Sequence, residues 1–484
     1  MFSVDLEKVS MVHWFPDLER HTCGYCKTEN GAVSYGMWAE QLTVDDYQNL
    51  IDRGWRRSGK YCYKPIMDLT CCPQYTIRCN TLDFKLTKSQ KKIIKRFNKF
   101  IGDGIGCKEV QENDETMDVV PHEYAIVKQK PNISIDRTKK INICNPVTTI
   151  EASDAPTTSY ATTEKTDKPS IADEKISHPK LDKPQCKKAK FLRLERKKQK
   201  LLSKGIVFEK TVKCNAAKSV EQFLNEIPAN GKHKFKTKLI SSEDINHKLE
   251  NDKLVEYEVY KKYQMVIHND PPSKCTLTGF IRFLVASPLM MVPANDSTAV
   301  TYGTFHQQYW LDDKLIAVAV LDVLPRCVSS VYFFYDPDYR FLTLGTYGSL
   351  REVQFVKSLY SKQSSLQFYY MGFYIHSCPK MRYKGNIDQS FLLCPETYYW
   401  FRIEQCLSKL NKNKYSRLND DLDAIDENFC TKSDIDAIKV HISYCVTYFG
   451  TYKRMYGEQH VFDNIGRLIG KKNAANLLFI SCKS

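Results

Sequence analysis

The sequence predicts an α+β fold in which helices flank a mixed sheet and a cysteine-rich domain precedes it. Residues 315–323, 328–335 and 368–375 are dominated by apolar, β-branched and aromatic side chains, which is the composition of strands. Between the last two, residues 349–360 place apolar side chains three or four positions apart, which predicts a helix. Two strands, a helix and a further strand indicate a layered domain in which the helix covers the sheet.

The composition indicates a folded, basic protein. Among the 484 residues, 71 Lys and Arg outnumber 56 Asp and Glu, so the net charge is +15 and an anionic partner is expected. The chain contains 29 Tyr and 24 Phe, which excludes a wholly disordered protein. Its length is sufficient for about three domains.

Three zones are expected along the chain: a cysteine-rich domain at 1–106, a largely disordered linker at 107–230, and a catalytic domain at 231–484. Residues 145–185 contain Thr, Ser, Asp, Lys and Pro with almost no large apolar side chain, so they cannot bury enough surface to fold. Residues 187–204 carry nine cations and one Glu in a helical pattern. That basic segment has three interpretations: a nuclear localisation patch, an RNA-contacting arm, or a solvated helix.

No membrane segment or signal peptide is expected. The longest uncharged apolar stretch, residues 283–295, is too short to span a bilayer and contains two prolines. The first residues are acidic, where a signal peptide begins with cations. We therefore expect no membrane partner and a cytoplasmic and nuclear location.

Two cysteine pairs have the spacing of metal ligands. Cys23 and Cys26 form a Cys-x-x-Cys pair, and Cys71 and Cys72 are adjacent, with Pro73 providing the turn that adjacent ligands need. Four thiolates suit zinc or an iron–sulfur cluster. The plainer interpretation is buried structural cysteines with a chance motif. Four further side chains are possible substitute ligands: His13, His21, Cys62 and Cys79.

Basic residues form two further candidate surfaces. Residues 53–61 interleave cations, including Arg56 and Arg57, with Trp and Tyr, a combination that suits phosphate contact and base stacking. Residues 85–99 predict an amphipathic helix whose polar face carries cations that can neutralise phosphates. A solvated basic face is the plainer reading of both.

Two strings of polar residues adjoin the predicted strands. Residues 301–309 contain His306 and Gln307, whose imidazole and amide groups can orient an amine or a carbonyl, although a single His beside a strand is commonly structural. Lys380, Arg382 and Lys384 alternate, so an extended segment would place all three on one face. Such a face can hold a carboxylate or phosphate, or it can protect a sheet edge.

Several catalytic motifs are absent from the sequence. It has no G-x-x-x-x-G-K-[ST] phosphate loop, no G-x-S-x-G elbow and no H-E-x-x-H pair. The Q/R-x-x-G-x-G/A loop that binds acetyl-CoA is also missing. We therefore expect neither ATP nor acetyl-CoA as a cofactor, and any acyltransferase activity would require a different acyl donor.

Several strings together resemble the eukaryotic arginyl-tRNA–protein transferase family over about residues 10–100 and 240–410. They are Cys23-x-x-Cys26 with Cys71-Cys72, Gly54-Trp-Arg-Arg-Ser-Gly59, Phe305-His-Gln-Gln-Tyr309, His376-Ser-Cys-Pro-Lys-Met-Arg-Tyr-Lys-Gly385 and Leu393-Cys-Pro-Glu396. The resemblance implies arginine transfer from arginyl-tRNA to the α-amine of proteins that begin with Asp, Glu or oxidised Cys, which marks them for ubiquitin-dependent degradation. It also implies a GNAT-like catalytic core and an iron–sulfur cluster, zinc or haem at the four cysteines.

The chemistry of that reaction suggests roles for the candidate residues. Transfer from an aminoacyl ester to an amine is downhill, so the enzyme must align the reactants and stabilise an oxyanion. The candidates for catalysis are Tyr302, His306, Gln307 and Tyr369; for an acidic acceptor, Arg382 and Lys384; for the arginyl guanidinium, Asp336, Glu352 and Glu396; for tRNA, Arg56, Arg57, Lys91, Lys92, Lys95, Arg96 and Lys99. Two alternatives are a non-enzymatic zinc-ribbon RNA-binding protein and a GNAT-like acetyltransferase.

Overall fold

The computed structural model describes residues 3–104, 130–131, 140–142, 218–296, 299–442, 445–457 and 463–481. These residues belong to one compact unit that comprises residues 1–145 and 218–484. The second unit, residues 146–217, lies outside the described residues, and so do most of the predicted linker and the basic segment at 187–204.

One sheet of eight strands contains the predicted strand–helix–strand pattern. Its neighbours are antiparallel except for β11 and β12, which run parallel. The α+β prediction is confirmed. In spatial order the strands are β14 (Trp400–Arg402), β13 (Ser390–Leu393), β6 (Tyr75–Asn80), β12 (Phe368–Tyr374), β11 (Cys327–Tyr335), β10 (Lys314–Val323), β9 (Gly303–Leu311) and β8 (Phe235–Ser241).

Helices cover both faces of this sheet. Helix α8 (Leu344–Tyr360) connects β11 to β12 and packs on the face that carries Phe333. Phe334 points to the opposite face, where its ring lies 5.7 Å from that of Tyr260 in α6 (Glu250–Ile267). Gly348 is required in α8, because a Cβ there would lie 2.4 Å from the Phe333 ring. The sheet is therefore the middle layer of a helix–sheet–helix arrangement.

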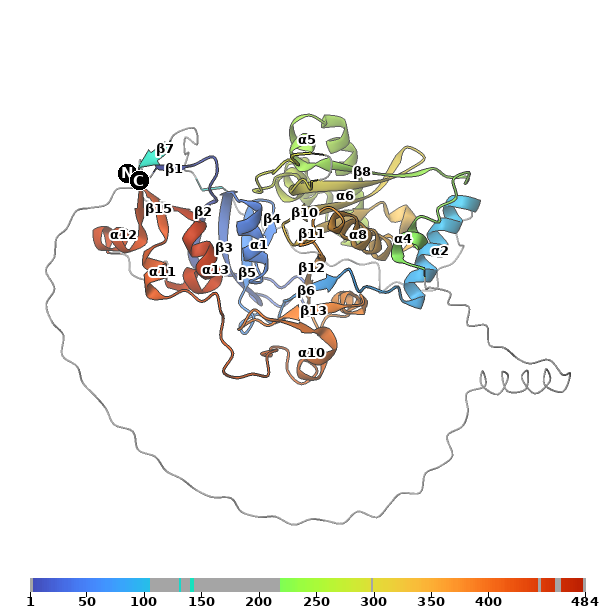
Figure 1. Ribbon diagram of the computed structural model, residues 1–484. Helices are drawn as coiled ribbons and strands as arrows, with labels where there is room; N and C mark the ends of the chain where they lie inside the picture. The colour runs from blue at the N-terminus through green and yellow to red at the C-terminus, as the bar shows by residue number, and fades with distance from the viewer. Residues whose placement is uncertain are drawn as a thin grey trace, which may run out of the picture. The chain divides into compact units, whose positions relative to one another are not determined.

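The amphipathic helix predicted around residues 85–99 is α2 (Lys88–Asp103). It begins with a capping box, in which Thr87 and Gln90 bond each other's backbone N–H, and ends at Gly104 with a positive φ of 66°. Figure 1 shows α2 beside the helices on the face of the sheet that α8 covers. The apolar face of α2 packs on α8, where the rings of Phe97 and Tyr347 stack at 3.9 Å. The basic face of α2 is thereby left outward.

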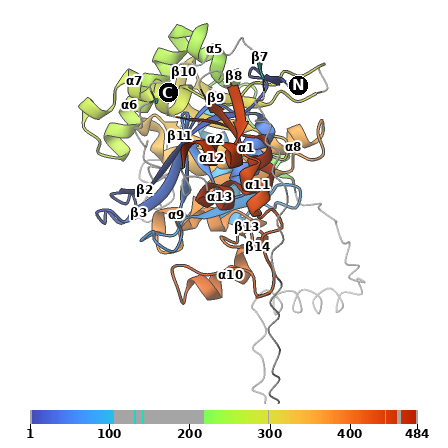
Figure 2. The same ribbon diagram turned by 90° about the vertical axis from the view of Figure 1, so that its left-hand side faces the viewer.

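A second sheet of seven strands combines segments from both ends of the described chain. Its parallel pairs are β15–β17 and β17–β2. Helix α13 (Asp463–Asn476) packs on α1 (Val44–Ile51), and Figures 1 and 2 show it grouped with α11 and α12. The strand order is β16 (Cys445–Tyr448), β15 (Lys439–Ile442), β17 (Leu478–Ile480), β2 (Met11–His21), β3 (Ala32–Gln41), β5 (Tyr61–Pro65) and β4 (Arg56–Ser58).

The structure divides the chain differently from the predicted boundaries at 106 and 231. Strand β6, from the predicted cysteine-rich domain, lies between β12 and β13 of the other sheet. Conversely, β15, β16 and β17 complete the N-terminal sheet. The predicted first and third zones are therefore interleaved, because β6 is paired on both edges by strands of the third zone and β17 pairs with β2 of the first zone.

The remaining elements are short. A third sheet pairs β1 (Ser3–Asp5) with β7 (Lys140–Asn142). Among the described residues, no helix combines the length and apolar character needed to cross a bilayer. The short helices are α4 (Val220–Leu224), α5 (Ser242–His247), η2 (Pro272–Lys274), α7 (Leu277–Phe280), η3 (Ile281–Val285), η4 (Pro337–Leu342), α9 (Pro379–Arg382), η5 (Tyr383–Asn386), α10 (Ile403–Leu410), α11 (Lys432–Asp436) and α12 (Phe449–Tyr456).

Candidate functional site

The parallel strands β11 and β12 separate and leave a recess between them. Their pairing covers residues 327–329 and 368–370 and ends there, although both strands continue. The recess is small, with a cavity volume of about 40 Å³. It is lined by Ser330, Val331, Tyr332 and Phe333 of β11, Gly345, Ser349 and Glu352 of α8, Tyr369 and Met371 of β12, and Tyr383 and Lys384 of η5.

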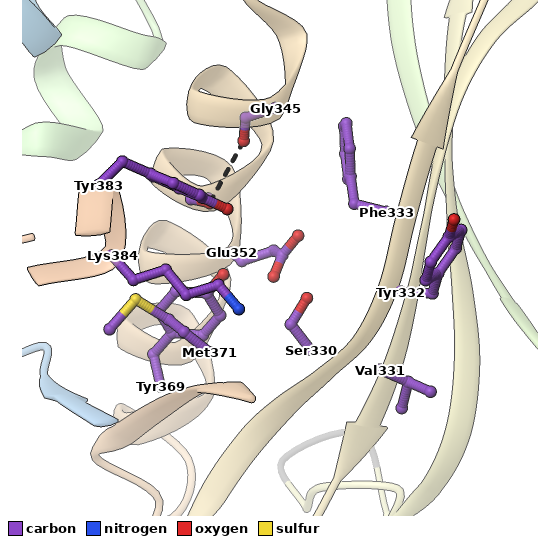
Figure 3. A pocket seen from close by; sticks show the side chains of 11 residues that line it. Ser330, Val331, Tyr332, Phe333, Gly345, Glu352, Tyr369, Met371, Tyr383 and Lys384 are labelled. Atoms are coloured by element: carbon purple, nitrogen blue, oxygen red, sulfur yellow. Dashed lines mark hydrogen bonds between the residues drawn. The ribbon is translucent and has the colours of Figure 1, made fainter. Parts of the chain in front are cut away.

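Glu352 is the buried carboxylate of this recess. Figure 3 shows it pointing from α8 toward Ser330, with the Lys384 nitrogen and Tyr369 nearby. Only 1% of Glu352 is exposed, and its Oε2 has no hydrogen-bond partner within the described structure. Burial raises its pKa to about 7, although the hydroxyls of Tyr369 and Ser330 and the charge of Lys384 oppose that rise. A buried carboxyl group with one unpartnered oxygen therefore lines the recess.

Lys384 and Arg382 do not share a face, contrary to the expectation of an extended segment. Pro379 begins the helix α9, which continues into η5, so the alternation of strands does not apply. Lys384 is buried and donates a hydrogen bond from Nζ to the carbonyl oxygen of Phe373 at 3.1 Å. Arg382 is exposed, and its Nε donates to the carbonyl oxygen of His376 at 2.6 Å.

The other two predicted guanidinium ligands already have protein partners. Asp336 accepts ion pairs from Lys262 at 2.6 Å and from Lys314 at 2.8 Å, one on each oxygen. Glu396 accepts hydrogen bonds from Tyr415 at 2.9 Å and from Arg417 at 3.0 Å, again one on each oxygen. Of the three candidates, Glu352 is the one with an oxygen left open.

The predicted catalytic residues separate into two places. Tyr369 lines the recess, where burial and the charge of Glu352 raise its pKa. His306 lies on the opposite face of the sheet, fully buried, with Nδ1 2.6 Å from Glu256 of α6 and Nε2 3.2 Å from the Leu284 carbonyl oxygen. Both of its ring nitrogens are thus engaged within the fold, as expected for a structural histidine.

Gln307 and Tyr302 also lie outside the residues that line the recess. The side-chain oxygen of Gln307 accepts a hydrogen bond from the Tyr309 hydroxyl at 2.8 Å. Tyr302 is half-buried, its backbone pairs with Val292, and burial raises the pKa of its hydroxyl. Neither side chain reaches Glu352 in the structure described.

Arg56 and Arg57 are buried, which corrects their assignment to a phosphate-binding surface. Arg57 forms a bidentate ion pair with Asp322 of β10, at 2.8 Å from Nε and 2.6 Å from Nη2. Arg56 donates hydrogen bonds to the carbonyl oxygens of Trp55 and Gly372. Both guanidinium groups therefore join β4 to the other sheet and do not face solvent.

The outward face of α2 retains its cations. Lys92, Lys95 and Lys99 are exposed, and Lys91 is half-exposed. Arg96 is also half-exposed and donates a hydrogen bond to the hydroxyl of Thr343, at the start of α8, at 2.9 Å. The basic surface thus adjoins the first turn of the helix that carries Glu352.

The four predicted cysteine ligands lie together. Their Sγ atoms are all within 4.8 Å of one another, and those of Cys26 and Cys71 are 3.3 Å apart. The turn after β2 supplies Cys23 and Cys26, and a second turn supplies Cys71 and Cys72. A backbone hydrogen bond joins this second turn to the residue before β3: the Cys71 N–H donates to the Gly31 carbonyl oxygen at 2.9 Å. Gly31 is needed there, since a Cβ would lie 2.7 Å from the Cys71 sulfur.

The thiols of the cluster differ in acidity. At Cys26 burial raises the pKa, but hydrogen bonds with Thr28 and with the neighbouring thiols outweigh it and lower the pKa to about 6. Burial raises the pKa of Cys71. Thiolates are the form that binds metals, and four of them are a ligand set for a soft metal ion. The possible substitutes Cys62, Cys79, His13 and His21 lie outside the cluster.

Sequence patterns did not indicate Ser330 and Tyr383 as lining residues. The available signal was small: Ser329 and Ser330 interrupt the apolar run of β11 at the point where its pairing with β12 ends. Polar residues inside a strand usually mark a solvent-facing side, so that signal does not identify the recess or the residues across it.

Comparison with known proteins shows extensive similarity to one group of enzymes. The family model described as arginine-tRNA-protein transferase, C terminus, matches residues 255–394, and the corresponding N-terminus model matches residues 21–92. Arginyl-tRNA–protein transferase 1 of Drosophila melanogaster is 42% identical over 480 residues, which cover 96% of this chain and 98% of that protein. Arginyl-tRNA–protein transferase 2 of Arabidopsis thaliana is 34% identical over 466 residues, 83% of this chain and 76% of the relative. An aspartate/glutamate leucyltransferase of Acinetobacter baumannii is 32% identical over 158 residues, 32% of this chain and 50% of the relative.

Proposed function

The chain belongs to the arginyl-tRNA–protein transferase family and is an aminoacyltransferase, and from that premise we propose that it arginylates proteins beginning with Asp, Glu or oxidised Cys. The observation that carries the proposal is the recess between β11 and β12, which combines a buried carboxylate and a buried ammonium. The donor contributes a cationic side chain and the acceptor an anionic one, so charges of both signs are needed where they meet.

The recess supports an acyl transfer that depends on alignment. Attack of the acceptor amine on the ester's carbonyl carbon places negative charge on the carbonyl oxygen, which hydrogen-bond donors can stabilise. The new C–N bond forms, the ester C–O bond breaks, and the terminal ribose hydroxyl of the tRNA leaves. Tyr369 and Lys384 supply such donors at the recess. The amine must lose a proton during transfer, and Tyr302, His306 and Gln307 are less suited to that role, because they lie away from the recess.

Cations near the recess suit an acidic acceptor. Arg382 is exposed only two residues before Lys384, so its guanidinium is available to a carboxylate or sulfinate in solution. An arginine binds such groups through two parallel hydrogen bonds. We propose that Arg382 binds the acidic side chain of the acceptor's first residue and that Lys384 faces the reacting groups.

The basic face of α2 suits the tRNA. Its exposed lysines can neutralise backbone phosphates without reading sequence. Since α2 packs against α8, a stem bound there lies beside an element that forms the recess. The tRNA surface is therefore proposed as Lys91, Lys92, Lys95, Arg96 and Lys99, without Arg56 and Arg57.

The cysteine cluster suits a single metal ion. Around a tetrahedral zinc with bonds of about 2.3 Å, sulfurs stand about 3.8 Å apart, which agrees with four sulfurs within 4.8 Å of one another. A cluster of several irons would require the sulfurs to stand farther apart. Cys23, Cys26, Cys71 and Cys72 would hold zinc as a structural ion that ties the two turns together.

The test is a transfer assay with defined acceptors. Arginyl-tRNA carrying labelled arginine is mixed with the enzyme and with peptides that differ only in a first residue of Asp, Glu, cysteine sulfinate or Lys. We expect label on the first three peptides and not on the Lys peptide. Tight retention of tRNA without transfer to any peptide would contradict the proposal and favour an RNA-binding module.

The biological consequence follows from the product. We propose that the new N-terminal Arg directs the protein to ubiquitin-dependent degradation and that the enzyme works in the cytoplasm and nucleus. A reporter protein with an exposed Asp should be short-lived in cells that contain the enzyme and stable in cells that lack it. Fluorescent tagging should place the enzyme in both compartments, and exclusion from either would contradict the location.

A further inference from the structure

The open oxygen of Glu352 requires a specific explanation. Buried polar atoms are nearly always hydrogen-bonded, because an unsatisfied acceptor loses its water without compensation. Glu352 is 1% exposed and its Oε2 faces the recess without a partner in the described structure. Both oxygens of the buried Asp336 are occupied by lysines, and those of the exposed Glu396 by tyrosine and arginine. The Glu352 oxygen therefore lacks a protein partner at the wall of the recess, and a ligand that enters the recess can supply the missing hydrogen bond.

The walls of the recess favour a planar cation. Aromatic side chains of Phe333, Tyr369 and Tyr383 line it together with the Met371 thioether (Figure 3). A guanidinium is weakly hydrated, stacks on aromatic faces and presents paired N–H groups that match a carboxylate. A compact ammonium is strongly hydrated and gains less from such walls.

We propose that Glu352 binds the guanidinium of the donor's arginyl group and thereby selects arginine over uncharged amino acids. The inference rests on the proposed arginyl transfer and adds the residue that reads the donor side chain. Glu352 is a binding group in this proposal and is not the base that removes the proton from the acceptor amine.

The test compares two donors that differ in charge alone. The same tRNA is acylated with arginine or with citrulline, whose neutral urea group has nearly the shape of guanidinium. For the wild-type enzyme, kcat/KM with an Asp-initiated peptide should be about a hundredfold higher for arginine, the loss typical of an unpaired buried charge. In Glu352→Gln the preference should fall to within about tenfold, since an amide can bond both groups.

Controls separate the possible failures. Glu404→Gln removes an exposed carboxylate on α10 and should leave the preference unchanged. Thermal unfolding confirms that Glu352→Gln is folded, and Glu352→Asp, which retains the charge, should keep a preference for arginine. If Glu352→Gln slows both donors equally, the preference survives and the inference is overturned, as it would be if Glu352 took the acceptor's proton. If the wild-type enzyme transfers neither residue, the proposed function itself fails.

Discussion

Asp322 and Glu352 are both buried carboxylates next to the same sheet, but their surroundings are opposite. Asp322 receives two hydrogen bonds from Arg57 and one from Thr304 at 2.7 Å, and both members of the ion pair are 0% exposed. Glu352 keeps one oxygen unpartnered. Asp322 therefore serves the fold through its ion pair, whereas Glu352 is the carboxylate that we propose binds a ligand.

The cysteine cluster resembles Glu352 in one respect, because we propose an external partner, a metal ion, for it as well. Replacing Cys71 and Cys72 together by Ser removes two of the four ligands, so we expect metal content to fall from about one ion per chain to nearly none. Elemental analysis of the purified protein measures it. Cys275→Ser changes a buried cysteine elsewhere and should keep the metal. Unchanged metal in the double variant would refute the ligand assignment.

Removing Arg57 should destabilise the protein, because it breaks the buried ion pair with Asp322. In Arg57→Ala the Asp322 carboxylate stays buried without its cation, which should lower the free energy of unfolding by about 3–5 kcal/mol. Urea denaturation at neutral pH measures the change. The partly exposed pair of Arg326 with Asp52 is the matched control, and Arg326→Ala should cost less than about 1 kcal/mol. A similar small cost for Arg57→Ala would show that the buried pair adds little.

Glu352→Gln should have the opposite effect on stability. Burial raises the pKa of Glu352 from 4.5 to about 7, so the folded protein holds a proton that the unfolded chain loses. The wild type therefore loses stability as pH rises from about 4.5 to 7, by up to about 3 kcal/mol, and the amide variant lacks this loss. Unfolding measured at pH 5 and pH 8 should show the variant gaining relative to the wild type at pH 8. If the variant and the wild type differ in unfolding free energy by the same amount at pH 5 and at pH 8, the raised pKa is contradicted.

The smallest effect is expected on the basic face of α2. Changing Lys92, Lys95 and Lys99 to Gln removes exposed cations without touching either buried carboxylate. The dependence of tRNA affinity on salt should become shallower by about 2–3 in the slope of log K against log salt concentration. The triple Arg variant keeps the charges and should keep the slope. A slope that does not change in the Gln variant would place the tRNA elsewhere.

The sequence predicted most completely the features that depend on local spacing. The cysteine quartet consists of two local pairs, and the strands around α8 follow from runs of apolar residues, so both could be identified without the fold. Arg57 shows the limit, because its string of cations looks like a surface and its partner, Asp322, lies 265 positions away. Glu352 was one of three equal candidates until the packing showed that the other two are paired.

His306 shows a second limit of local patterns. Its neighbours suggested a reactive imidazole, but alternation along β9 places it on the face toward α6, opposite the recess. Which face of a strand adjoins the recess depends on where β11 and β12 part, and the two serines at that point of β11 do not indicate the face of β9.

The position of β17 has a consequence for how the protein is made. This strand pairs Leu478 and Phe479 with Met11 and Val12, and it lies between β15 and β2. During synthesis the ribosome must add more than four hundred residues before the edge of β2 finds its neighbour. Until then that edge offers unpaired backbone groups to other chains, so nascent copies should depend on chaperones, and a chain cut before β17 should aggregate.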